Sequence, residues 1–140
     1  LSGTDIDPQA IAWCQRHLSY ARTLVNPHLP PLPFDAASFD AIYAISVFTH
    51  LNEEMQLQWL AELRRVLTPE GVLLVTLLGG GEGLTNAGNL NWRGTFPSWY
   101  QDTLHSEDYV RKTFAQWFRV VAYVPKGMNA HQDVVLLRPV

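Results

Sequence analysis

The stretch FDAIYAISVFTHL, residues 39–51, carries the main indication of the fold. Its first part, Phe39 to Ile45, is almost continuously apolar, which is typical of a strand covered on both faces in a parallel sheet. The segment from Asn52 to about Leu67 has two acidic residues in its first turn and one apolar stripe, and this pattern predicts a helix. After a TPEG turn, GVLLVTLLG (residues 71–79) reads as a second buried strand. Residues 39–79 therefore predict a strand-helix-strand unit with a right-handed parallel crossover.

The residues before this unit predict a similar arrangement. LSGTDIDPQAIAWC, residues 1–14, reads as the end of a strand that leads into a helix. Asp7 can cap a helix whose first residue is Pro8, and the apolar spacing extends the predicted helix to Ala21. Leu24 and Val25 permit a short strand before a proline-rich extended loop.

The residues after the unit differ in character. Residues 79–97 are rich in glycine and asparagine and predict a lid, a binding loop or a disordered segment. No helix pattern follows GGGEG (79–83), which argues against a phosphate-binding loop. Ser106 can cap a third helix, and the apolar runs 118–124 and 133–138 predict an antiparallel hairpin. The fold class is thus α/β, with one domain spanning residues 1–140.

Composition limits the partners. The 140 residues are 47% hydrophobic and carry a net charge of -3 without basic runs, which argues against nucleic acid and anionic membrane surfaces. No stretch has the length and apolar character of a membrane span, and we expect a cytoplasmic protein. Cys14 is the single cysteine and is expected to pack in the interior, and scattered histidines without paired carboxylates predict no metal site.

Three segments together carry a family resemblance. LSGTDIDPQAIAWC, LPFDAASFDAIYAISVFTHL and ELRRVLTPEGVLLVTLLG, in this order and spacing, resemble the class I S-adenosylmethionine-dependent methyltransferases. The resemblance implies a Rossmann-like three-layer sandwich with the sheet order 3-2-1-4-5-7-6, mostly parallel with an antiparallel C-terminal hairpin. Leu1 would then lie in strand 2, and strand 1 and its glycine-rich cofactor loop have no counterpart. We expect additional residues upstream and an inactive fragment as it stands, unless strands 2 and 4 pair directly or another chain supplies a strand.

The resemblance also implies S-adenosylmethionine as the cofactor. Asp5 matches the acid that binds the ribose hydroxyls, and Ile6 would lie against the adenine. Asn26 or His28 stands where many members read the adenine amino group, although solvation in the loop is an equal alternative. The residues implied to border the methionine moiety are Ala44, Ile45 and Ser46.

Methyl transfer to a hydroxyl or amine needs a base, and histidine is suited to that task. His50 is the candidate nearest to the implied site, with His105 and His131 as further options. Aromatic residues in or beside the long loop could line an acceptor pocket or anchor the loop; they are Trp92, Phe96, Trp99 and Tyr100.

The expected function is methyl transfer to an unidentified small molecule, sugar or peptide side chain. A non-catalytic binding or scaffolding module with the same fold is the alternative, and a nicotinamide-dependent enzyme is a second rival. The sequence leaves the acceptor and the oligomeric state open.

Overall fold

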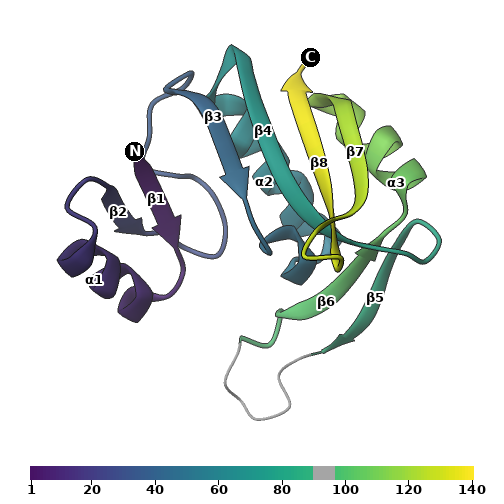
Figure 1. Cartoon of the computed structure of the whole chain (residues 1–140), viewed down its shortest axis with the longest axis horizontal. Coiled ribbons are helices and arrows are strands. Elements are labelled where there is room, and N and C mark those ends of the chain that lie inside the picture. The colour runs from purple at the N-terminus through teal and green to yellow at the C-terminus, as the bar shows by residue number, and fades with distance from the viewer. Residues whose placement is uncertain (90–96) are drawn as a thin grey trace. The chain divides into compact units, whose positions relative to one another are not determined.

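The computed structural model describes residues 1–89 and 97–140. The chain forms two compact units, Leu1–Pro33 (unit 1) and Phe34–Val140 (unit 2). Each unit has its own sheet, and the arrangement of elements within each is shown in Figure 1.

Unit 1 is a strand-helix-strand unit. Strands β1 (Ser2–Asp5) and β2 (Arg22–Val25) pair in parallel, and helix α1 (Pro8–His17) connects them. Asp7 caps the helix as predicted, because its carboxylate accepts the backbone N–H of Gln9 at 2.7 Å. The predicted extension of the helix to Ala21 is wrong. Leu18 leaves the helical conformation, and a short turn lets the chain enter β2 at Arg22.

Unit 2 contains a six-stranded sheet. Its main part has the order β3 (Phe39–Ala44), β4 (Leu67–Gly79), β8 (Gln132–Pro139), β7 (Phe118–Met128), as Figure 1 shows. β3 and β4 are parallel, whereas β8 is antiparallel to both β4 and β7. The predicted antiparallel C-terminal hairpin is confirmed. β4 begins before the predicted strand, but its register against β3 shifts between Leu67 and Val72, where the TPEG residues bulge out of the ladder.

The expectation that the strand at 39–45 is covered on both faces is wrong for the described residues. Ile42 and Ala44 pack against the core, but Tyr43 on the opposite face is 68% exposed. β4 is the strand that pairs with β3 within the part of the chain that the structure describes. The continuous apolar run therefore has alternating burial, because one face of β3 contacts the helices and the other does not.

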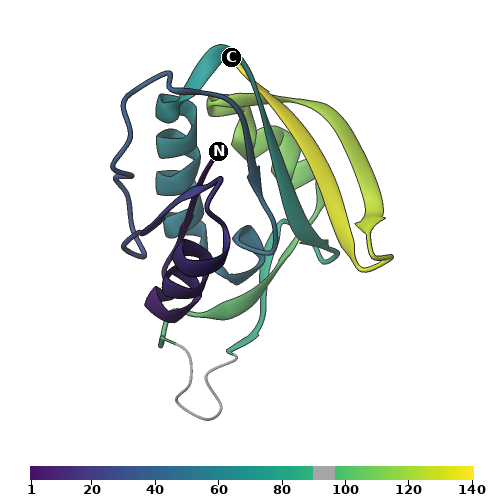
Figure 2. The same ribbon diagram turned by 60° about the vertical axis from the view of Figure 1, so that its left-hand side comes forward.

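One hydrophobic core holds unit 2 together. Helix α2 (Glu53–Val66), helix α3 (Glu107–Thr113) and the 3₁₀ turn η2 (Phe114–Gln116) contribute to the same buried cluster as β4 and β8. Both helices therefore cover the same face of the sheet, as Figure 2 shows. The fully buried members of the cluster include Leu60, Leu73, Val75, Leu77, Val110, Phe114, Phe118, Val135 and Leu137.

The segment predicted as a lid or loop is partly a hairpin. Strands β5 (Leu84–Asn89) and β6 (Gln101–His105) pair antiparallel, and β6 extends the main sheet by pairing in parallel with the end of β4. Gly80, Gly81 and Gly83 have positive φ angles and turn the chain from β4 into β5. A strand, not a helix, follows these glycines, in agreement with the absence of a helix pattern after GGGEG in the sequence. Trp92 and Phe96 lie outside the described residues.

The capping residue of α2 gives a prediction for stability. Asn52 Oδ1 accepts the backbone N–H of Met55 at 2.9 Å. Asn52→Ala is expected to lower the free energy of unfolding by about 1 kcal/mol, because one donor of the first turn loses its partner. Chemical denaturation measures the effect. Asn52→Ser is the matched control and should stay within a few tenths of a kcal/mol of the parent; equal losses in both variants would show that the cap contributes nothing.

Candidate functional site

A group of polar side chains lies where β3 and β4 reach their carboxyl ends. Ser46 directly follows β3 and has a φ of 55°, which is uncommon outside glycine. Its backbone N–H donates to the buried Thr76 Oγ1 of β4 at 2.8 Å. Its Oγ lies 2.8 Å from Nε2 and 3.1 Å from Oε1 of Gln132, at the start of β8. Hydrogen bonds from two neighbouring strands thus hold the bend that takes the chain out of β3.

The bend leads into a short turn that carries His50. The 3₁₀ turn η1 (Phe48–His50) buries Phe48 in the core, where its ring contacts the ring of Phe114 at a centroid distance of 6.2 Å. The His50 side chain remains 22% exposed, so a bound molecule can reach it. Burial of Phe48 two residues away fixes the position from which His50 projects.

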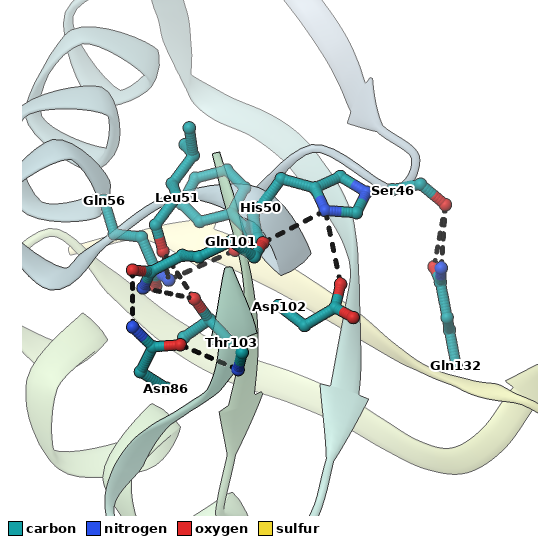
Figure 3. A network of polar contacts seen from close by, with 11 residues as sticks. Ser46, His50, Leu51, Gln56, Asn86, Gln101, Asp102, Thr103 and Gln132 are labelled. Carbon is teal, nitrogen blue, oxygen red and sulfur yellow. Dashed lines mark hydrogen bonds and ion pairs between the residues drawn. The ribbon is translucent and has the colours of Figure 1, made fainter. Parts of the chain in front are cut away.

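Strand β6 supplies the surroundings of the His50 ring (Figure 3). Nδ1 of His50 lies 3.2 Å from the carbonyl oxygen of Gln101 and 3.5 Å from Oδ1 of Asp102. The ring stacks on Tyr100, with 4.2 Å between centroids and 17° between planes. One face and one nitrogen of the imidazole are therefore held by neighbours, and Nε2 lies on the other side of the ring from Asp102 (Figure 3).

A chain of hydrogen bonds fixes β6 against η1 and α2 (Figure 3). Thr103 Oγ1 donates to the carbonyl of Leu51 at 2.9 Å, and Gln101 Nε2 donates to Thr103 Oγ1 at 3.0 Å. The buried Gln56 of α2 donates to the carbonyls of both Phe48 and Leu51. Because the buried side chains of Gln56 and Thr103 both make hydrogen bonds to the backbone of this region, β6 is held in one position beside His50.

Burial excludes His105 as the alternative catalytic base. It is fully buried, and its Nε2 lies 2.9 Å from Gln56 Oε1. Burial lowers the pKa of His105 from its ordinary value to about 4, while the backbone carbonyls of Leu78 and Thr103 and the charge of Asp133 oppose the shift. A bound acceptor cannot reach this ring, so His105 acts in the core. His131 is exposed in the turn between β7 and β8.

The residues with an implied role toward the nucleoside lie together in unit 1. Asp5 ends β1, and its backbone carbonyl accepts the N–H of Asn26, directly after β2, at 3.0 Å. Asp5 Oδ1 accepts the N–H of Asp7 at 2.8 Å, a bond that leaves Oδ2 uninvolved. Ile6 is 40% exposed. The carboxyl ends of two parallel strands thus bring together an acid, an apolar side chain and an amide.

Asn26 and the other predicted residues differ in their exposure to solvent. Asn26 is 9% exposed, and its Nδ2 donates to the carbonyl of Pro27 at 2.7 Å, which leaves its Oδ1 as the polar atom for a ligand. His28 is exposed in the proline-rich loop. In unit 2, Ala44 packs against the core, whereas Ile45 is 40% exposed just before Ser46. The structure thus brings Ala44, Ile45, Ser46 and His50 to one end of the sheet of unit 2.

Sequence reasoning missed three residues of this site: Thr76, Asp102 and Gln132, which come from β4, β6 and β8. Tyr100, at the entry to β6, is one of the aromatic residues that the sequence placed beside an acceptor pocket or as anchors of the loop. Asp102 lies in QDTLH, where polar and apolar residues do not alternate as in a half-buried strand. A strand signal there would have been needed to place Asp102 beside His50.

Residues 1–89 and 97–140 contain no group of three or more histidine, cysteine, aspartate or glutamate side chains that could hold a metal ion. In these ranges no helix is both long and apolar enough to cross a membrane.

Several solved structures with the same fold are described as methyltransferases. A 1,6-didemethyltoxoflavin-N1-methyltransferase of Burkholderia thailandensis, solved with bound 1,6-didemethyltoxoflavin and S-adenosylhomocysteine, matches 99% of this chain at 18% identity with a TM-score of 0.73. A SAM-dependent methyltransferase of Methanosarcina mazei matches 99% of this chain and 81% of its own at 16% identity, with a TM-score of 0.75. The glycopeptide N-methyltransferase MtfA, solved with S-adenosylhomocysteine, matches 99% at 13% identity, with a TM-score of 0.69 and 72% of its own chain covered.

At these identities the likeness establishes the fold, a Rossmann-like α/β methyltransferase fold. The chain spans 60% of the length of the Burkholderia protein. The family described as Methyltransferase domain matches residues 1–75, which is more than half of the 140 residues and includes both Asp5 and His50. With the sheet order of unit 2 and this match taken together, the chain belongs to the Methyltransferase domain family.

Proposed function

We propose that the protein acts in the transfer of a methyl group from S-adenosylmethionine to a small molecule, a sugar or a peptide side chain. The family match over residues 1–75 carries this proposal. The solved methyltransferases with bound S-adenosylhomocysteine support the choice of cofactor. A cytoplasmic location and the exclusion of nucleic-acid partners remain part of the proposal and rest on the charge distribution of the sequence.

The residues of unit 1 fit the nucleoside part of this cofactor. The proposed role of Asp5 is to accept hydrogen bonds from the ribose hydroxyls. Its Oδ2 can do so, because the bond from the N–H of Asp7 uses Oδ1. Ile6 offers exposed apolar surface to a flat ring, and Asn26 Oδ1 is an acceptor suited to an exocyclic amino group. These three side chains therefore present the polar and apolar groups that a nucleoside requires.

The residues of unit 2 fit the reacting part. We assign Ala44, Ile45 and Ser46 to the methionine moiety, because they lie at the carboxyl end of β3, where open α/β sheets bind ligands. S-adenosylmethionine supplies an activated methyl group on its sulfonium sulfur. The neutral thioether product needs no acid, so the chain has to align the acceptor and remove its proton. His50 is the proposed base, since its ring is reachable and is held by Gln101 and Asp102.

Cofactor binding tests this function through Asp5. Titration of S-adenosylhomocysteine into the 140-residue chain, followed by NMR shifts, measures dissociation constants into the millimolar range. Asp5→Ala is expected to weaken binding by about tenfold or more, because hydrogen bonds to a charged acceptor contribute roughly 1.5 to 3 kcal/mol.

Two further variants make the test specific. Asp5→Asn can still accept the N–H of Asp7, so a loss of affinity in this variant reports on the ligand and not on the local turn. Glu70→Ala removes an exposed carboxylate of unit 2 and should leave the affinity unchanged. Equal affinities of the parent and both Asp5 variants would remove Asp5 from the site, and no binding by the parent at millimolar concentration would contradict the assignment of these residues to the cofactor.

A further inference from the structure

The environment of His50 determines which ring nitrogen carries the hydrogen. Nδ1 faces two acceptors, the carbonyl oxygen of Gln101 at 3.2 Å and the carboxylate oxygen of Asp102 at 3.5 Å. Neither group can donate a hydrogen bond when Asp102 is ionised. In the neutral imidazole the hydrogen therefore lies on Nδ1, and Nε2 carries the lone pair. The hydrogen-bond partner of one ring nitrogen decides which of the two nitrogens is protonated.

The position of Asp102 is set by the strand on which it lies. β6 pairs with β5 on one side, where Asp102 is opposite Gly88, and with the end of β4 on the other. The bond from Thr103 Oγ1 to the carbonyl of Leu51 joins β6 to the segment that follows His50. Tyr100, directly before β6, stacks on the His50 ring. The carboxylate and the imidazole are therefore fixed by a common set of contacts, although 51 positions separate His50 from Gln101.

We propose that Asp102 is a positioning residue that holds His50 in the Nδ1–H tautomer, so that Nε2 accepts a proton from the methyl acceptor. The inference rests on the proposed function and deepens it. A site with such a base serves an acceptor whose nucleophilic atom carries a transferable proton, which is a hydroxyl or an N–H group. A thioether or a tertiary amine has no proton to lose and would gain nothing from His50.

Methyl transfer forms one bond to the methyl carbon, breaks the bond of that carbon to sulfur and releases one proton from the acceptor. The lone pair of the acceptor oxygen or nitrogen forms the bond to the methyl carbon, and the electrons of the carbon–sulfur bond stay on sulfur. The acceptor's proton passes to Nε2 of His50, which becomes an imidazolium. The Asp102 carboxylate then faces the positive ring and stabilises it.

The tautomer is measured directly by NMR of the 15N-labelled chain. Long-range 1H–15N correlation spectra of the neutral imidazoles distinguish the protonated nitrogen from the unprotonated one, and His50→Gln identifies the His50 signals. The parent is expected to show His50 mainly as the Nδ1–H tautomer. His17 is an internal reference in every spectrum, because its Nδ1 lies 2.8 Å from the carbonyl of Trp13 and, among residues 1–89 and 97–140, it forms no ion pair with a carboxylate.

Substitutions of Asp102 then separate its effect from that of Gln101. Asp102→Ala is expected to shift His50 toward the Nε2–H tautomer, Asp102→Asn should act in the same direction without changing the side-chain shape, and Asp102→Glu should restore the parent tautomer. Asp108→Asn, on the exposed side of α3 where Asp108 pairs with Lys112, is the control and should change nothing.

Two results would overturn the inference: an Nε2–H tautomer in the parent, or an unchanged tautomer in Asp102→Ala and Asp102→Asn, which would leave the carbonyl of Gln101 as the sole determinant. The proposed function fails separately, in the S-adenosylhomocysteine titration. If the Asp102 variants change the His50 tautomer but the parent does not bind S-adenosylhomocysteine, the result would contradict methyl transfer. It would still support Asp102 as the residue that positions the His50 ring.

Discussion

Alanine in place of Phe114 is expected to lower the free energy of unfolding of unit 2 by about 3 to 5 kcal/mol, the range measured for buried phenylalanine. Phe114 lies in η2 and has no exposed surface. Its ring contacts that of Phe48, which is itself 1% exposed, and both belong to the cluster formed by α2, α3, β4 and β8. Removal of the ring loses its transfer free energy and leaves a cavity that close-packed neighbours fill only in part.

Denaturant unfolding followed by tryptophan fluorescence measures this loss. Tyr43→Ala is the control, because that aromatic side chain is 68% exposed on β3, and its effect should stay below about 1 kcal/mol. Similar losses in the two variants would contradict the placement of the core. Because Phe48 lies in the turn that carries His50, Phe114→Ala should also broaden the NMR signals of the His50 ring.

Acidification should destabilise unit 2 through His105. Burial lowers the pKa of His105 in the folded chain to about 4, whereas the unfolded chain has the ordinary value near 6.5. Between these two values the unfolded state binds a proton that the folded state does not, so stability is complete above pH 6.5 and falls as the pH falls toward 4. The expected loss is about 3 kcal/mol over this range.

Comparison of variants isolates this contribution from that of the carboxylates, which titrate in the same range. The free energy of unfolding is measured at about pH 7.5 and pH 4. The free energy of unfolding of His105→Gln should change less between these two pH values than that of the parent. The reduction should equal most of the loss assigned to His105. His131→Gln, at an exposed turn, should keep the slope of the parent. Parallel pH dependences in the parent and His105→Gln would show that His105 ionises normally in the folded state.

The elements predicted correctly are those whose signals lie within a few residues. Asp7 and Ser106 cap their helices as predicted, because a cap acts on a backbone N–H two or three positions away, and α2 begins directly after Asn52, where a helix was predicted. The apolar runs at 39–45 and 71–79 form parallel strands on either side of α2, since burial and periodicity are repeated along each segment. The C-terminal hairpin follows from two apolar runs with a short link.

Errors arose where the environment of a segment comes from elsewhere. The apolar spacing continued to Ala21, but α1 ends at His17 because the chain must turn into β2. The run at 39–45 looked equally apolar on both faces, yet only one face of β3 meets the helices of unit 2. β5 and β6 have neither an apolar run nor regular alternation, and their pairing even includes a register shift between Asn86 and Gly88.

The sequence alone therefore determined the order of the strands and helices other than β5 and β6, the family and the candidate residues Asp5, Ser46 and His50, because these depend on local patterns and on motifs that remain together along the chain. Only the tertiary structure decided which side chains surround His50 and that His105 is buried. The reason is physical: Asp102 and Tyr100 reach His50 through the pairing of β6 with β4 and β5, and such pairing depends on contacts between segments distant in sequence.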